Sequence, residues 1–287
     1  MAEEALARLL LWSGITLAVR RLLWRNRILI VVYHDPSPEV MDSHLKYLCK
    51  IAVPITLSDF NRRPHDRPCV LITIDDGYVG NKALLDVFRD HNVRPTIFLC
   101  SSIAGTHRQF WQHSDAAANQ FETLKRLKNN SRLSKLAAAG FHQESETEKR
   151  AALSVQDIEQ MTGIVDFQSH GRFHPVLTHC NDDECNIEIV QSRQEIDKLV
   201  GRECRHFAHP FGNYGEREIA FLKSAGYRSA RTLDLGWNNE KTDPFRLKAV
   251  VIDDNCSWVC CAAAVSLIPA YLRYLRRGSF FGRFPQF

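Results

Sequence analysis

The chain has 287 residues, of which 45% are hydrophobic and 24% are charged, a composition typical of a soluble protein with one large α/β domain or two small ones. Its net charge of +4 is weak and no stripe of basic residues stands out, which excludes a nucleic-acid-binding surface. Nine cysteines without a repeated C-x-x-C pair favour free thiols in a reducing compartment over a disulfide framework.

The N-terminal segment is apolar from Leu9 to Val19, with acidic residues before it and Arg20-Arg21 after it. A secretory signal has the opposite order of charges, and eleven mostly apolar residues are too few to span a bilayer. We therefore expect residues 1–27 to form an amphipathic helical extension that packs on the domain. The expected location is cytoplasmic, and the apolar segment also permits peripheral contact with a membrane.

Residues 28–256 alternate between apolar runs and helical patterns. The expected strands are 28–33, 69–74, 94–100, 164–168, 206–208, 227–232 and 245–252, and residues 51–57 are a short apolar segment. The expected helices are 39–50, 81–90, 153–161, 182–199 and 216–225; in the fourth of these, Ile187, Val190, Ile196 and Leu199 are spaced to form one buried face. This alternation predicts an α/β fold with a mostly parallel sheet, and about seven strands favour a barrel.

Two further segments flank or interrupt this pattern. Residues 104–150 are polar with helical propensity, and we expect an insertion with two or three helices. Residues 257–287 begin apolar and then carry Arg273, Arg276 and Arg277, which predicts a C-terminal helix and tail. This helix either packs on the domain or faces a membrane surface, and Pro269 makes it a poor spanning helix.

Three of the expected strands end in residues that can do chemistry. Strand 69–74 ends in Asp75-Asp76, strand 164–168 is followed by His170 and His174, and strand 206–208 ends in His-Pro-Phe-Gly at 209–212. Because the carboxyl ends of parallel strands meet at one rim of a barrel, these side chains are expected to converge. A turn rich in acidic residues is the alternative interpretation of the Asp-Asp-Gly sequence taken alone.

His170 and His174 are four residues apart, so on one helical turn both imidazoles would face the same way. Two histidines and one carboxylate are a typical catalytic zinc set. Surface or capping histidines are the more common explanation of such a pair alone, but the two-acid strand end that precedes it favours a metal site.

These motifs resemble those of a known family. Thr-Ile-Asp-Asp-Gly at 73–77, Ser-His-x-x-x-His-Pro at 169–175 and Phe-Ala-His-Pro-Phe-Gly at 207–212 are similar to the first three motifs of the polysaccharide deacetylases (NodB-homology domain, carbohydrate esterase family 4). The resemblance covers about residues 28–252 and implies a distorted (β/α) barrel. It also implies metal-dependent hydrolysis of N- or O-acetyl groups from a carbohydrate, a polysaccharide or a lipid-linked glycan.

The resemblance also implies roles for single residues. Asp75 matches the general base, and the backbone N–H of Phe211 matches an oxyanion donor. The matching ligands of a divalent metal ion are Asp76, His170 and His174. The ion implied is Zn²⁺, with Co²⁺, Ni²⁺ or Mn²⁺ as alternatives. Contacts with the substrate are expected from His34, Tyr78 and Pro210.

The sequence departs from the family pattern at two points. Many members have an arginine two residues before the proline of the third motif, where this chain has Ala208. The candidates to replace it are Arg205, Arg246 and Lys248. The family also often has a late Leu-x-His that supplies the general acid, but no histidine follows His209, which leaves His209 or His34 for that role.

Three functions remain open at this stage. The first is a metal-dependent deacetylase of an acetylated carbohydrate. The second is an inactive member of the same fold that binds glycan or acts as a scaffold, and the two departures are its support. The third is a metal-dependent amidohydrolase acting on a small non-sugar amide. The sequence leaves the oligomeric state undetermined.

Overall fold

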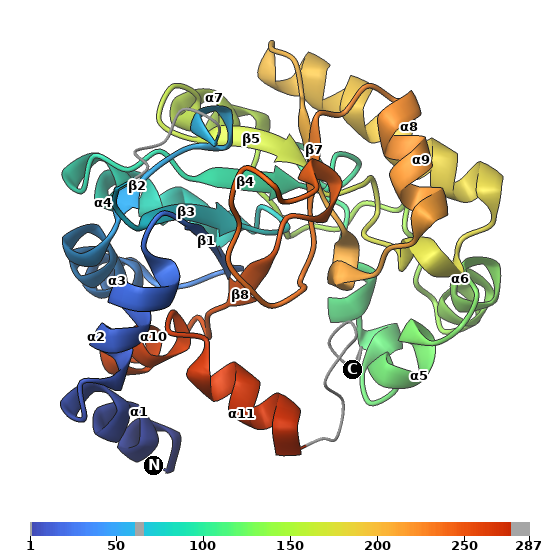
Figure 1. Ribbon diagram of the computed structural model, residues 1–287. Helices are drawn as coiled ribbons and strands as arrows, with labels where there is room; N and C mark the ends of the chain where they lie inside the picture. The colour runs from blue at the N-terminus through green and yellow to red at the C-terminus, as the bar shows by residue number, and fades with distance from the viewer. Residues whose placement is uncertain (1, 61–65, 277–287) are drawn as a thin grey trace.

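The computed structural model describes residues 2–60 and 66–276, and its centre is a single sheet in which all pairings are parallel (Figure 1). Seven strands follow one path in the order β7-β6-β5-β4-β3-β1-β8, and β2 pairs with the start of β3. The strands are β1 (Ile28–Tyr33), β2 (Val53–Pro54), β3 (Cys69–Ile74), β4 (Thr96–Leu99), β5 (Asp166–Ser169), β6 (His206–Ala208), β7 (Ser229–Arg231) and β8 (Ala249–Val251).

The two ends of this path nearly meet, so the sheet is an almost closed barrel. Leu247 donates its backbone N–H to Ala230 (3.0 Å) and accepts from Thr232 (2.8 Å), next to β7. Two residues later β8 begins and pairs with β1. The α/β barrel of about seven parallel strands predicted from the sequence is therefore confirmed.

Alternate residues of β1 and β3 serve two different apolar layers. Leu29 and Val31 pack outward with the covering helices, whereas Ile30 and Val32 pack inside the barrel with Leu71 and its neighbours. Both strands are buried on both faces, which is why they are continuous apolar runs in the sequence.

Helices cover the outside of the barrel, and their starts follow capping rules. Asn181 and Glu184 form a capping box at the start of the longest helix, and Ser154 and Asp157 form one at another. The helices between strands are α3 (Pro38–Ile51), α4 (Leu85–Asp90), α5 (Phe121–Lys125), α6 (Asn129–Ala138), α7 (Val155–Met161), α8 (Asp182–Val200) and α9 (Glu216–Ser224).

The terminal segments form a further group of helices. The expected single N-terminal helix is divided at Gly14 (φ 74°) into α1 (Ala2–Trp12) and α2 (Ile15–Val19), followed by the π-helical turn η1 (Arg20–Trp24). At the other end lie α10 (Trp258–Ala264) and α11 (Ile268–Arg276), and residues 277–287 of the expected tail lie outside the described part of the chain.

Two expectations about single elements were wrong. The last strand is shorter than 245–252, because Pro244–Arg246 forms a 3-10 turn. The buried face of α8 is also different: Ile187 is exposed, whereas Glu188 and Ser192 are buried. Apolar spacing mislocated this face because α8 buries polar side chains, one of which supports the site described below.

Candidate active site

The site begins at the carboxyl end of β3, where the apolar strand turns abruptly. The N–H of Asp75 donates to the Tyr33 carbonyl (2.9 Å), which extends the pairing with β1 by one residue. Asp76 (φ 70°) and Gly77 (φ 71°) then reverse the chain. A Cβ on Gly77 would stand 2.3 Å from the Leu99 side chain, so this turn needs glycine. Both carboxylates are left at the rim, nine-tenths or more buried.

The two histidines follow β5 on a loop, and the expected helical turn is not present. The loop is held by Glu188 of α8, whose Oε2 accepts the backbone N–H groups of Arg172 (2.6 Å) and Phe173 (3.1 Å). His174 itself adopts φ 56°. The four-residue spacing did not distinguish a helical turn from this loop, because a left-handed residue in a loop can also bring two imidazoles to the same side.

Asp76, His170 and His174 form the one group of potential metal ligands found among the described residues, with ligand atoms all within 4.8 Å of one another. The Oδ1 of Asp76 lies 3.3 Å from His174 Nε2 and 3.7 Å from His170 Nε2. Ligands at ordinary zinc distances and tetrahedral angles stand about 3.4 Å apart. The donor set and its spacing therefore fit a divalent ion of the zinc type.

Groups behind the cluster fix the orientation of its ligands. His170 Nδ1 lies 2.8 Å from the Ala208 carbonyl, so that nitrogen donates its proton there and Nε2 remains for a metal ion. Trp111 donates its indole N–H to the carbonyl of His174 (2.9 Å). Trp111 is buried, so it supports the loop and does not stack on a sugar.

Burial sets the protonation of both imidazoles. It lowers the pKa of His170 to about 4 and that of His174 to about 3, although the charge of Asp75 opposes the shift in each case. Both rings are therefore neutral near pH 7. Neutral imidazole is the form that binds a metal ion.

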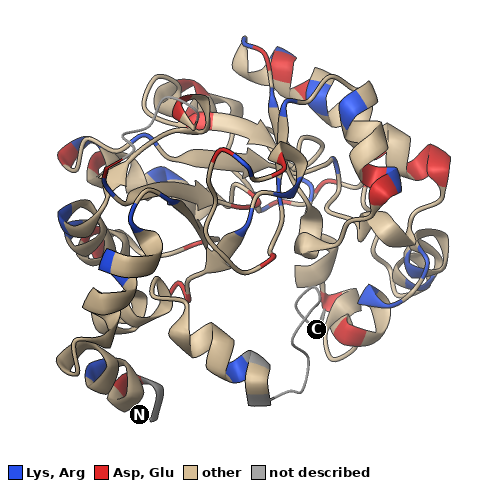
Figure 2. Cartoon of the chain, in the orientation of Figure 1, with Lys and Arg blue, Asp and Glu red and all other residues tan. Residues whose placement is uncertain are grey.

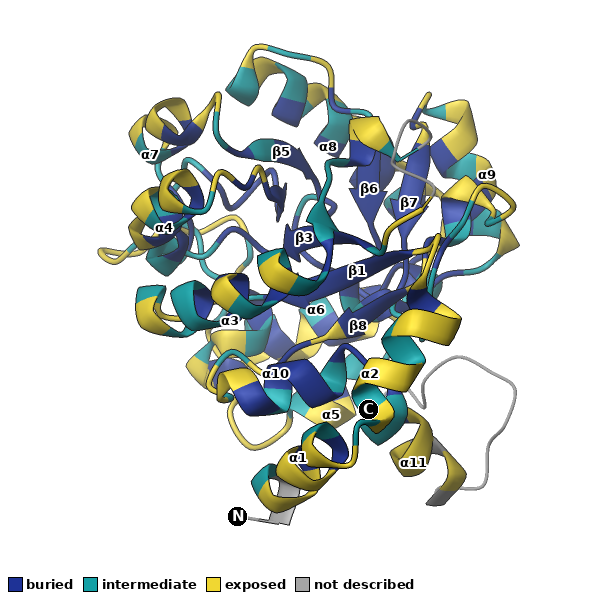
Figure 3. Cartoon of the chain, turned by 60° about the vertical axis from the view of Figure 1, so that its left-hand side comes forward, coloured by how far each residue is buried: buried dark blue, intermediate teal, exposed yellow. Residues whose placement is uncertain are grey.

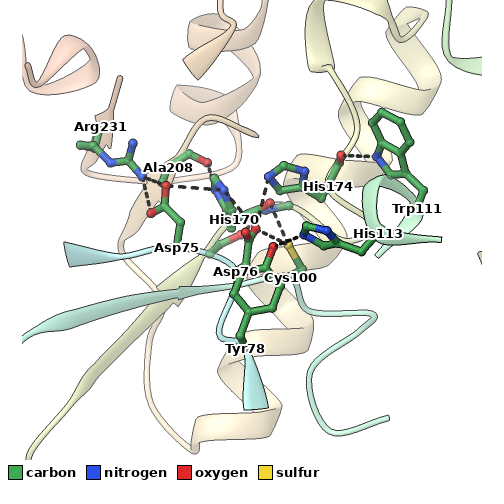
Figure 4. Close-up of polar contacts among 12 residues, drawn as sticks. Asp75, Asp76, Tyr78, Cys100, Trp111, His113, His170, His174, Ala208 and Arg231 are labelled. Atoms are coloured by element: carbon green, nitrogen blue, oxygen red, sulfur yellow. Dashed lines mark hydrogen bonds and ion pairs between the residues drawn. The ribbon is translucent and has the colours of Figure 1, made fainter. Parts of the chain in front are cut away.

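Arg231 of β7 is the residue that the sequence analysis missed. Its guanidinium contacts both carboxylate oxygens of Asp75, and both side chains are almost fully buried (Figure 4). None of the three basic residues proposed from the sequence has this position. Burial by itself would raise the pKa of Asp75, but the charges of Arg231 and His170 outweigh it, so this pKa lies below its ordinary value. The expected strand 227–232 contains Arg228 and Arg231, so the sequence did not indicate which of them is buried; in the structure Arg228 is exposed and Arg231 is buried, where a guanidinium requires an anion.

Asp75 and the three potential metal ligands open into one cavity of about 990 Å³. His34, Tyr78 and Phe211 line it together with both aspartates and both histidines. His209 and Pro210 are buried and are not among its lining residues; the ring of His209 stacks on Tyr214. The structure therefore does not bring His209 to the site as an acid, or Pro210 as a substrate contact.

Backbone conformation distinguishes three of these residues. Apart from asparagines, positive φ angles in non-glycine residues of the described chain occur at Asp76, His174, Phe211 and Leu267. The first three line the cavity. Such conformations cost free energy and persist where the surrounding structure enforces them, often at functional sites.

The family model described as "Polysaccharide deacetylase" matches residues 62–230, which is more than half of the chain. The chain belongs to the polysaccharide deacetylase family. As a member of this family it is a hydrolase, a carbohydrate deacetylase, and the matched residues include both aspartates and both histidines of the cluster.

Solved structures of other polysaccharide deacetylases share the fold. The Streptococcus pyogenes deacetylase PplD, solved with acetate, is 15% identical with a TM-score of 0.61, and the match covers 83% of this chain and 97% of that one. IcaB from Ammonifex degensii is 16% identical with a TM-score of 0.62, covering 84% and 97%. BA0330 from Bacillus anthracis, described as a putative polysaccharide deacetylase, is 17% identical with a TM-score of 0.59, and the match covers 83% of this chain and 69% of that one. No curated protein is significantly similar in sequence.

Proposed function

We propose that this deacetylase is metal-dependent and removes N- or O-acetyl groups from a sugar that enters the cavity. The proposal rests on one observation: a ligand set of Asp76, His170 and His174 lies beside a carboxylate, Asp75, that is held by an arginine. A bound Zn²⁺-like ion would polarise the acetyl carbonyl and lower the pKa of the attacking water.

Residues of the chain supply the general base, the group that orients it and an oxyanion donor. Asp75 is 3.8 Å from the His170 ring and takes the proton of the attacking water as general base. Arg231 holds Asp75 as an anion and fixes its direction. Phe211 lies against His174, with ring centroids 4.4 Å apart, and its backbone N–H supports the developing oxyanion.

The general acid is assigned to His34. It follows β1 at the same rim and lines the cavity, unlike His209. Its backbone is held on both sides: its N–H donates to Asp254 (3.1 Å), and its carbonyl accepts from Asn81 (2.9 Å). A side chain on so fixed a backbone can deliver a proton to the leaving amine or alcohol in a defined direction.

The test begins with metal content and continues with acetate release. Elemental analysis of the purified protein is expected to give about one zinc-like ion per chain. His174→Ala is expected to lose it, whereas His142→Ala, which changes an exposed histidine outside the cluster, is expected to keep it. Asp75→Asn is expected to keep the ion and lose acetate release from acetylated oligosaccharides.

Three outcomes would overturn the proposal. A protein that neither contains nor takes up zinc or cobalt lacks the proposed mechanism. A metal-loaded protein that releases no acetate from any acetylated sugar is an inactive member of the fold. Turnover of simple amides without preference for acetylated sugars indicates the small-amide hydrolase instead.

A further inference from the structure

Exposed apolar side chains are concentrated at the two ends of the chain. Of the fourteen large apolar residues exposed in the described part of the chain, eleven lie in α1, α2, η1, α10 and α11. Figure 3 shows exposed positions along α1, α2 and α11. Trp12 is 90% exposed, Leu22 78% and Leu9 65%. Scattered exposed apolar residues are normal, but this clustering is not.

These helices are firmly placed by their inner faces. Ala7 and Leu10 of α1 pack on Val259 and Ala263 of α10, and Ile268 of α11 joins the same apolar cluster. Glu4 also accepts a hydrogen bond from Ser257 (2.8 Å). Because the inner faces are fixed, the outer apolar faces are held toward solvent at one end of the molecule (Figures 1 and 3). We name this outer surface the terminal face: Leu9, Trp12, Ile15, Leu22, Leu272 and Leu275.

Arginines accompany this face. Arg21 and Arg25 are exposed beside Leu22, and Arg273 is exposed beside Leu272. Figure 2 shows a basic position and no acidic one on α11. The sequence has the same asymmetry: residues 1–27 hold five arginines and two glutamates, and residues 257–287 hold four arginines and no acid, although the whole chain is only +4. Residues 28–256 are therefore net acidic, by three charges.

We propose that the terminal face docks on an anionic phospholipid bilayer. Short helices with leucine and tryptophan on one side and arginine beside them lie in the interface between lipid headgroups and acyl chains. Within the described residues, no helix has the length and apolarity needed to cross a membrane. A second copy of this chain is a poorer occupant, because it would bring two arginine-rich surfaces together.

One of these helices, α11, forms part of the cavity that holds the candidate active site. Ala270 and Arg273 of α11 line it together with Asp76 and His174. A protein docked through α11 therefore holds this wall of its cavity close to the lipid surface. In a step that rests on the proposed function, the substrate is an acetylated sugar carried on a lipid anchor in that surface.

Co-sedimentation with vesicles tests the docking without any turnover. Wild-type protein is expected to sediment with vesicles containing phosphatidylglycerol at low ionic strength, and far less with pure phosphatidylcholine or at high salt. The double variant Leu9→Ser/Leu22→Ser is expected to bind about tenfold less or weaker still. Ile187→Ser on α8 is the matched control, since Ile187 is equally apolar and 42% exposed but lies away from this face. Equal melting temperatures would establish that both variants fold.

Wild-type binding no stronger than that of the double variant would overturn the proposal, as would an equal loss in Ile187→Ser. A concentration-dependent dimer that the double variant abolishes, without vesicle binding, would assign the face to a second copy. Acetate release is measured on the same preparations, from a soluble acetylated oligosaccharide and from an acetylated glycolipid in the vesicles. Vesicle binding without release from either substrate would sink the proposed function alone, and release without vesicle binding would sink the docking alone. Release from the soluble sugar with no preference for the glycolipid would sink the lipid-anchored substrate alone.

Discussion

Ala208 on β6 and Arg231 on β7 are register partners, side by side on two parallel strands. The family pattern has its arginine at the position of Ala208, whereas this chain brings a guanidinium to Asp75 from the neighbouring strand. The position of the family arginine and Arg231 are therefore adjacent in space. The carboxylate of Asp75 is therefore paired with an arginine that comes from a different part of the sequence.

Removing this arginine tests whether it positions the base. We expect Arg231→Ala to lower kcat by about 100-fold, because Asp75 loses the group that directs it. A buried carboxylate left unpaired also lowers the free energy of unfolding by about 3–5 kcal/mol. Steady-state kinetics and urea denaturation measure the two effects. Arg205→Ala is the control, because Arg205 is half-buried, its side chain pairs with Glu203 and not with Asp75, and its loss is expected to change neither quantity much.

The register suggests a rescue. In the double variant Ala208→Arg/Arg231→Ala, the guanidinium returns to the family position beside the same carboxylate. We expect kcat to recover by about tenfold relative to Arg231→Ala, since proximity to Asp75 is partly restored. A folded double variant with no recovery would show that the two positions are not interchangeable, and full activity of Arg231→Ala would refute the positioning role.

Glu188 is expected to control metal affinity without touching the ion. Its carboxylate holds the loop between the two histidines through the backbone N–H groups of Arg172 and Phe173. Glu188→Ala should weaken zinc binding by about 10–100-fold, whereas Glu188→Gln, which keeps an acceptor oxygen, should weaken it less. Competition with a chromophoric chelator measures the affinity, and the exposed Asp183→Ala on the same helix is the control. Unchanged affinity in Glu188→Ala would mean that the loop holds its own conformation.

Metal binding should stabilise the fold measurably. A ligand at one hundred times its Kd stabilises the native state by about 2.7 kcal/mol. Added zinc should therefore raise the melting temperature by several degrees in wild type and His142→Ala, and a chelator should reverse the shift. In His174→Ala the shift should disappear because one of three ligands is gone. An equal shift in all three proteins would place the bound ion elsewhere.

Acid should destabilise the protein partly through His206, which is buried at the start of β6. Burial first, and then the charges of Arg205 and Arg228, lower its pKa to about 4 from an unfolded value of 6.5. The unfolded chain therefore takes up a proton before the folded one, so stability is lost as pH falls through this window. The loss attributable to His206 is at most roughly 3 kcal/mol.

The variant His206→Asn isolates this contribution. Asparagine can keep the contact with Ser229 Oγ, which lies 2.8 Å from the ring Nδ1, but it does not titrate. Urea denaturation at several pH values should give a shallower dependence for the variant than for wild type. Parallel curves would mean that His206 contributes nothing to acid sensitivity.

The residues that the sequence predicted best are those that directly follow a strand in the sequence. Asp75 and Asp76 follow an apolar strand directly, and His170 and His174 follow another, so strand patterning alone indicated that they would meet at one rim. The barrel was predictable for the same reason, since strands buried on both faces are continuous apolar runs. Their catalytic and ligand roles remain predictions.

The residues that the sequence analysis missed or misplaced have contacts with residues that lie far from them in the sequence. Arg231 is 156 positions from its partner Asp75, and only strand register brings them together. Glu188 lies on a helix whose apolar spacing pointed to the face of Ile187, because the pattern assumes that buried faces are apolar. His209 was placed at the site by its motif, but the turn after β6 directs its ring onto Tyr214.

The pairing of β1 with β8 and of α1 with α10 has a consequence for biosynthesis. Glu4 of α1 and Ser257 at the start of α10 are 253 positions apart, so α1 is translated long before its partner. Closure of the barrel depends equally on contacts between residues far apart in sequence, which fold slowly. Nascent chains therefore carry an uncovered apolar α1 until α10 has been translated, and this interval is when aggregation or chaperone capture would act.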